Sequence, residues 1–197
     1  DAGNSSIIAV GGSCLTSCTT GDRNTAVGGR AMEACTTGSY NTALGHSAGL
    51  GVTTGSHNIG IGAFALQKWY GGTTGSNNIG IGNYTFNELT SGSSNTAVGH
   101  HALKVVTTGE ASVAIGAEAL LANTTGGWNV AIGKYALKAN TTANQNVAIG
   151  YKAGETITTN SQITAVGNLA LENCTGSNNT AIGCFAGDAI TSGEGNT

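Results

Sequence analysis

The stretch SVAIG at residues 112–116 is followed by NVAIG at residues 129–133 and by NVAIG again at residues 146–150. Working outward from these three, the same order of a β-branched, a small and an aliphatic residue followed by glycine recurs eleven times along the chain. Successive copies are 17 residues apart, except for one spacing of 20 and one of 16 residues. One repeated unit therefore fills the chain, and we expect a single domain over residues 1–197 that forms a segment of a longer fibre.

The repeat length decides between fold classes. Seventeen residues are too few for a pair of helices, and β-branched residues, Gly and Thr-Thr corners are poor helix formers. Two short strands and two turns fit this length. We predict an all-β fold, a parallel β-solenoid or β-roll of about eleven 17-residue rungs, and we expect it to be homotrimeric. At a strand spacing of about 4.8 Å the rungs would form a rod roughly 50 Å long.

The repeat also predicts two faces for each strand, because successive side chains point to opposite sides. We expect the residues three and one positions before the glycine to form a thin core. The other face carries Asn, Ala and Gly, and we expect another wall of the same chain or of a neighbouring subunit to approach it closely. Stacked Asn side chains can hydrogen-bond along such a ladder, or they can shape the turn before each strand. The ladder residues are Asn24, Asn41, Asn58, Asn78, Asn95, Asn129, Asn146 and Asn179.

The composition excludes several classes of function. Only 9% of the residues are charged, the net charge is -3, and seven Lys and Arg offer no basic stripe for a nucleic acid. No apolar run approaches the roughly 20 residues that span a bilayer, so we expect no membrane insertion. Residues 45–49 and 60–65 match nucleophile-elbow and dinucleotide-binding patterns, but both lie in register with the other rungs and no helix follows them. We expect no enzyme activity, no metal and no cofactor.

Two of the five cysteines form a candidate disulfide. Cys18 and Cys35 each lie seven residues after the glycine of their rung, so we expect them to stack on adjacent rungs. Stacked rungs bring the Cα atoms within the separation that a disulfide tolerates. The alternative is that both are small core residues, because Val52 and Val106 occupy the same position on other rungs.

Four aromatic residues are candidates for contact with a ligand. The long rung carries three extra residues around Trp69 and Tyr70, and insertions in solenoids form surface loops. These two rings can stack on a sugar ring, or they can cap a widened core. Trp128 and Tyr40 lie five residues before a rung glycine, in a variable column that we expect to face solvent.

The NVAIG stretches closely resemble the head repeat of trimeric autotransporter adhesins. The longer form, TTGxxNTAVGxxAL, found with small departures at residues 19–32 and 91–103, looks even more like repeats in the tail or neck fibres of phages and large viruses. The first resemblance implies a trimeric, left-handed parallel β-roll. It also implies that the chain is its own main partner.

These observations lead to a functional hypothesis. We expect a structural segment of an extracellular or virion fibre that mediates attachment to a cell surface, with a host glycan or protein as a further partner. The alternatives are a self-assembling extracellular filament whose subunits stack end to end, and an ice-binding β-solenoid with a threonine ladder.

Overall fold

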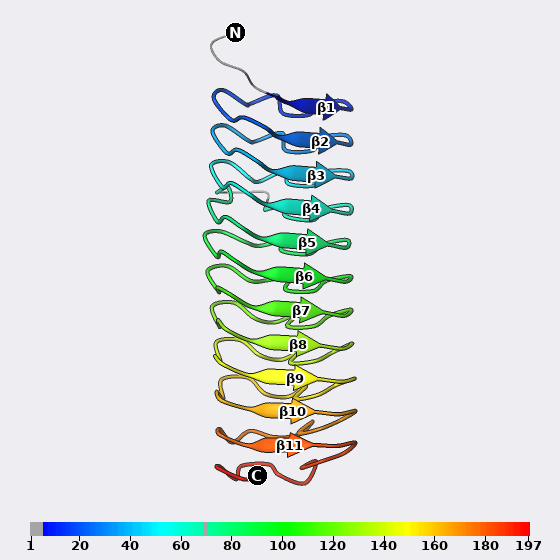
Figure 1. Cartoon of the computed structure of the whole chain (residues 1–197), viewed down its shortest axis with the longest axis vertical. Helices are drawn as coiled ribbons and strands as arrows, with labels where there is room; N and C mark the ends of the chain where they lie inside the picture. Colours follow the sequence, from blue (N-terminus) through cyan, green and yellow to red (C-terminus); the bar gives the residue numbers. More distant parts are fainter. Residues whose placement is uncertain (1–5, 69–70) are drawn as a thin grey trace.

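A computed structural model describes residues 6–68 and 71–197. Eleven three-residue strands form one sheet, and each strand pairs in parallel with the next one in the sequence. The strands are β1 (Ile8–Val10), β2 (Thr25–Val27), β3 (Thr42–Leu44), β4 (Ile59–Ile61), β5 (Ile79–Ile81), β6 (Thr96–Val98), β7 (Val113–Ile115), β8 (Val130–Ile132), β9 (Val147–Ile149), β10 (Thr164–Val166) and β11 (Thr180–Ile182). They lie across the long axis and stack along it (Figure 1), which confirms an all-β solenoid of about ten turns.

The glycine after each strand closes the rung in a conformation that only glycine adopts easily. Gly116, for example, has a φ of +132°. A Cβ atom at this residue would lie 2.6 Å from both the carbonyl carbon and the carbonyl oxygen of Gly133 on the next rung. The close approach of successive rungs therefore explains why this position is Gly in every copy of the repeat.

Three further positions in each rung have a left-handed backbone conformation, although most copies carry a residue other than glycine there. On the rung of β2 they are Arg30, Met32 and Tyr40, with φ values of 60°, 50° and 59°. They lie two and four residues after the rung glycine and five residues before the next one. Such residues cost about 1 kcal/mol each, so stacking of the rungs must offset this strain.

The two faces of the strands are opposite to the sequence-based prediction. Ala114 in the middle of β7 is fully buried, whereas Ile115 beside it is 39% exposed. The Asn/Ala face therefore lines the interior, and the β-branched and aliphatic face is the outer surface. The alternation along the strand is as predicted, but its orientation is wrong.

The physical reason for this orientation is the volume of the side chains in the returning segment, which is the part of each rung between its glycine and the next strand. The residue four positions after the glycine, such as Leu120 or Leu137, fills the interior and leaves space only for a small partner in the strand. Phe86 takes this place on the rung of β5, and there the strand residue is Gly80. A Cβ on Gly80 would lie 2.7 Å from Oγ1 of Thr85 and 2.9 Å from the Phe86 ring, so the two larger side chains of this rung leave space only for glycine.

Candidate functional site

The main candidate is the outward face of the sheet, which we name the apolar strip. It consists of the residues three and one positions before each rung glycine. The column next to the glycine is aliphatic on all eleven rungs, and Ile81, Ile115 and Ile149 in it are 39%, 39% and 37% exposed. The other column is half-buried on the rungs of β2 to β11 and contains Val, Ile or Thr. The strands that carry these residues stack along the whole rod (Figure 1).

Charge is distributed unevenly around the rod. The chain has seven Lys and Arg and ten Asp and Glu, and none of them occupies the apolar strip. The returning segment is different, because ion pairs link successive rungs there. Lys138 lies 3.0 Å from Glu118, and Lys152 lies 3.3 Å from Glu172. One side of the rod is therefore apolar and uncharged, and other sides are polar.

The eight predicted ladder Asn residues lie inside the roll and link the rungs. Nδ2 of Asn24 donates to the carbonyl of Gly38 at 2.8 Å, and its Oδ1 accepts from the backbone N–H of Asn41 at 2.9 Å. On the rung of β7 Ser112 replaces Asn, and its hydroxyl accepts from the N–H of Asn129 at 3.2 Å. Each amide thus holds both the neighbouring strand and the corner of the next rung.

Two of the predicted ligand-contact residues lie in what we name the pre-strand column, five residues before each rung glycine. Tyr40 is 45% exposed, but its ring is stacked on His57 at 4.8 Å and Arg23 lies 5.0 Å from the ring centroid. These contacts cover part of the ring, and the exposed remainder agrees with a column that faces solvent. Trp128 is 60% exposed, and its backbone N–H donates to the carbonyl of Glu110 at 2.9 Å. No ring, cation or hydrogen-bond partner contacts its indole among the described residues.

The sequence analysis missed a continuous line of rings in the post-strand column, which we define as the two residues after each rung glycine. His46 contacts Phe64 edge-on at 5.3 Å, Phe64 stacks on Tyr84 at 4.9 Å, and Tyr84 contacts His101 at 5.4 Å. His101 stacks on His100 at 3.7 Å. Burial and the neighbouring His100 lower the pKa of His101. The sequence could have predicted this line, because all five rings lie one or two residues after a rung glycine.

The candidate cysteine pair lies on adjacent rungs as free thiols. Each thiol donates to the carbonyl of the glycine three residues later, Gly21 for Cys18 and Gly38 for Cys35, at 3.5 Å. Burial, with the Cys18 thiol next to it, raises the pKa of Cys35 from 9.0 to about 12. The disulfide stays a prediction.

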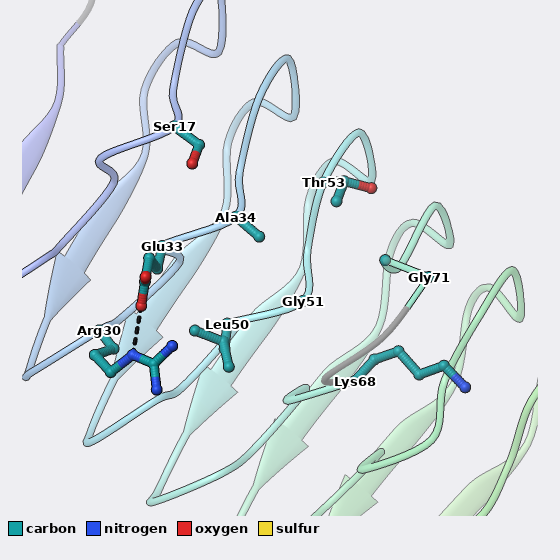
Figure 2. A pocket seen from close by; sticks show the side chains of 10 residues that line it. Ser17, Arg30, Glu33, Ala34, Leu50, Gly51, Thr53, Lys68 and Gly71 are labelled. Atoms are coloured by element: carbon teal, nitrogen blue, oxygen red, sulfur yellow. Dashed lines mark hydrogen bonds and ion pairs between the residues drawn. The ribbon is translucent and has the colours of Figure 1, made fainter.

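Trp69 and Tyr70 on the long rung lie outside the described residues. Beside that rung is a cavity of about 350 Å³, lined partly by Leu50, Thr53 and Lys68. Figure 2 shows Arg30 and Glu33 paired at one side of this cavity and Lys68 at the other. The nitrogen of Lys68 lies 3.5 Å from Glu88, so the cations at the rim have carboxylate partners.

The described part of the chain shows no arrangement typical of a catalyst. The hydroxyl of Ser47, the serine of the elbow-like pattern, is buried and has no hydrogen-bond partner there. Over residues 6–68 and 71–197, no group of three or more His, Cys, Asp or Glu is placed to bind a metal ion. The same residues include no helix that could span a membrane.

The ice-binding alternative depends on the threonine ladder, but at most corners one hydroxyl is hydrogen-bonded to the backbone of the next rung. Oγ1 of Thr107 donates to the carbonyl of Thr124 at 3.1 Å, and Oγ1 of Thr124 donates to the carbonyl of Thr141 at 3.0 Å. At most corners only the second threonine, such as Thr108, is exposed, although Thr19 and Thr158 are exposed first threonines. A single column of free hydroxyls is narrower than the paired flat array that this alternative needs.

Comparisons with known proteins add no assignment to this geometry. No family model matches the chain, and searches of curated proteins and of solved structures give no match either. The function must therefore be argued from the apolar strip, the columns beside it and the repeat itself.

Proposed function

We propose that the chain is a structural segment of an extracellular or virion fibre, which works as a homotrimer and holds a receptor-binding tip away from its base. The observation that carries this proposal is the apolar strip, which is aliphatic next to the glycine on all eleven rungs and has Thr at five positions of its other column. A monomeric protein seldom exposes a contiguous apolar surface of more than a few hundred Å². A strip about 50 Å long and roughly 7 Å between its two columns, without a charge, is typical of a surface that a partner covers.

A copy of the same chain is the partner that fits best. The strip repeats every 17 residues, so a second strip offers the same period of side chains over the whole length. Three strips that face a common axis would form an apolar core between the subunits and leave the charged sides in solvent. The resemblance of the repeat to those of trimeric adhesin heads and viral fibres supports the number three and the role in attachment.

Light scattering at several protein concentrations tests the assembly. We expect a constant mass of three chains of 19.4 kDa each. A constant mass of one chain would overturn the proposal. A mass that grows with concentration would favour the end-to-end filament instead. Electron microscopy should show rods, and a compact globule would contradict the fibre.

Two substitutions on one rung make the test specific for the strip. Ile115→Glu places a carboxylate in the apolar strip, where three of them would converge in a trimer, and we expect a folded monomer. Leu121→Glu on the returning segment of the same rung is the matched control, and we expect it to stay trimeric. Equal masses for the two variants would show that the strip is not the interface.

A further inference from the structure

Each ring on the pre-strand side of the apolar strip shares its rung with a ring on the post-strand side, whereas the rungs of Tyr84, His101, Tyr151 and Phe185 carry a ring on the post-strand side alone. Tyr40, His57 and Trp128 are the ring-bearing residues of the pre-strand column. Each of these rungs also carries a ring in its post-strand column. In the same order these are His46, Phe64 and Tyr135.

Contacts within one chain do not account for this matching. The two columns lie at opposite ends of the same strand, roughly 15 to 20 Å apart for six or seven residues of mostly extended chain. The ring contacts of the described residues run along a column, such as Tyr40 with His57 or Tyr135 with Tyr151. None of them crosses from one column to the other.

Parallel assembly through the apolar strip would bring the two columns together. The strands lie across the long axis of the rod (Figure 1), so both ends of a strand are at nearly the same height. Rotation about an axis parallel to the rod keeps that height, and it places the pre-strand end of one copy beside the post-strand end of the next. We propose, on the basis of the parallel oligomer proposed above, that Trp128 of one copy packs against Lys134 and Tyr135 of the next copy.

The chemistry of these side chains fits such a contact. Trp128 is 60% exposed, and its indole has no ring, cation or hydrogen-bond partner among the described residues of its own chain. The Lys134 and Lys138 ammonium groups lie 4.7 and 4.4 Å from the centroid of the Tyr135 ring. Indole is the aromatic side chain that attracts a cation most strongly, and aromatic pairs add to this attraction. A second copy of the chain therefore accounts for the exposure of Trp128.

Cysteine cross-linking tests this contact. In a Cys184→Ser background, the double variant Trp128→Cys/Lys134→Cys should form a covalent trimer under mild oxidation, visible on a denaturing gel without reductant. Each single variant should stay monomeric on that gel. The matched control is Trp128→Cys/Asn168→Cys, whose second cysteine is in the same column two rungs further along. It should cross-link at least ten times less.

The outcomes separate this inference from the proposed function. A trimer by light scattering that does not cross-link between positions 128 and 134, or cross-links equally well to position 168, would overturn the inference alone. A covalent dimer would support the contact but contradict the trimer. A monomer without cross-links would overturn both.

Discussion

Oδ1 of Asn129 accepts a hydrogen bond of 3.0 Å from the backbone N–H of Asn146, one rung further along the solenoid. Nδ2 of Asn129 donates to the carbonyl of Ala143 at 2.8 Å. Both partners are buried, so Asn129→Ala leaves an N–H and a carbonyl without a bond, at about 1–3 kcal/mol for each. We expect this variant to lower the free energy of unfolding by about 3 kcal/mol, measured by urea denaturation.

The chain supplies the control for this variant. Ser112 occupies the equivalent position on the preceding rung and accepts the bond from the next strand with its hydroxyl. Asn129→Ser should therefore keep one of the two hydrogen bonds and lose about half as much stability. If the Ala and Ser variants have the same free energy of unfolding as the unmodified protein, the ladder does not stabilise the fold.

Asn140 is buried like Asn129, but neither atom of its amide has a hydrogen-bond partner among the described residues. It lies seven residues after its rung glycine, where another rung has Val106. Because a buried amide without a partner is unfavourable, we expect Asn140→Val to raise the free energy of unfolding by about 1–2 kcal/mol. The same substitution at Asn146 removes satisfied bonds and should have the opposite sign in the same denaturation measurement. Equal signs would refute this distinction.

The sequence predicts part of this fold from the repeat alone, and the rest depends on contacts between distant residues. The period alone predicted the position and register of the strand before each glycine, because each rung needs the same glycine. The second strand expected in each rung is wrong, since the described residues form one strand per rung and only an isolated bridge between Val52 and Thr73 elsewhere. The period could not predict which strand face is inside, since Ala114 and Ile115 are both apolar. That choice depends on the volume of Leu120 across the interior, which is a tertiary contact.

The candidate site was predicted only in part, for the same reason. Stacking of Cys18 on Cys35 follows from their equal distance to a glycine. The apolar strip was predicted as core, so its availability to a partner was missed. The exposure of Tyr40 agrees with the prediction, but its contacts with His57 and Arg23 were missed, because these neighbours lie on other rungs.

The rung glycines should tolerate no side chain. Gly116 has a φ of +132°, and a Cβ there would lie 2.6 Å from the backbone of Gly133. We expect Gly116→Ala to cost about 3 kcal/mol or more, from backbone strain and from separation of the two rungs. Gly29→Ala is the control, since its Cβ would meet only His46, at 3.5 Å. A thermal melt that shifts equally for both variants would contradict this explanation.

The raised pKa of Cys35 predicts a loss of stability at alkaline pH. The thiol of the unfolded chain ionises at its ordinary pKa of 9.0, whereas the folded protein holds the proton up to about 12. The unfolded state therefore binds fewer protons between these values, and the free energy of unfolding falls as the pH rises from 9 to 12. Cys35→Val removes this contribution, so its denaturation midpoint should fall less between pH 8.5 and pH 11 than that of the unmodified protein. Parallel slopes would show that Cys35 does not titrate as described.

Oxidation should join Cys18 to Cys35. The two thiols lie on adjacent rungs, where the strand spacing of about 4.8 Å is within the Cα separation of disulfides. The bond would join residues 17 positions apart and stabilise the fold by about 3 kcal/mol. The expected result is a peptide pair linked through these two cysteines in a non-reduced digest, with a higher melting temperature that reductant reverses. Cys35→Val is the control and should show neither change. If the oxidised protein still reacts fully with a thiol reagent at Cys18, the pair does not form, and Cys35 belongs to the core in the same way as Val52 and Val106.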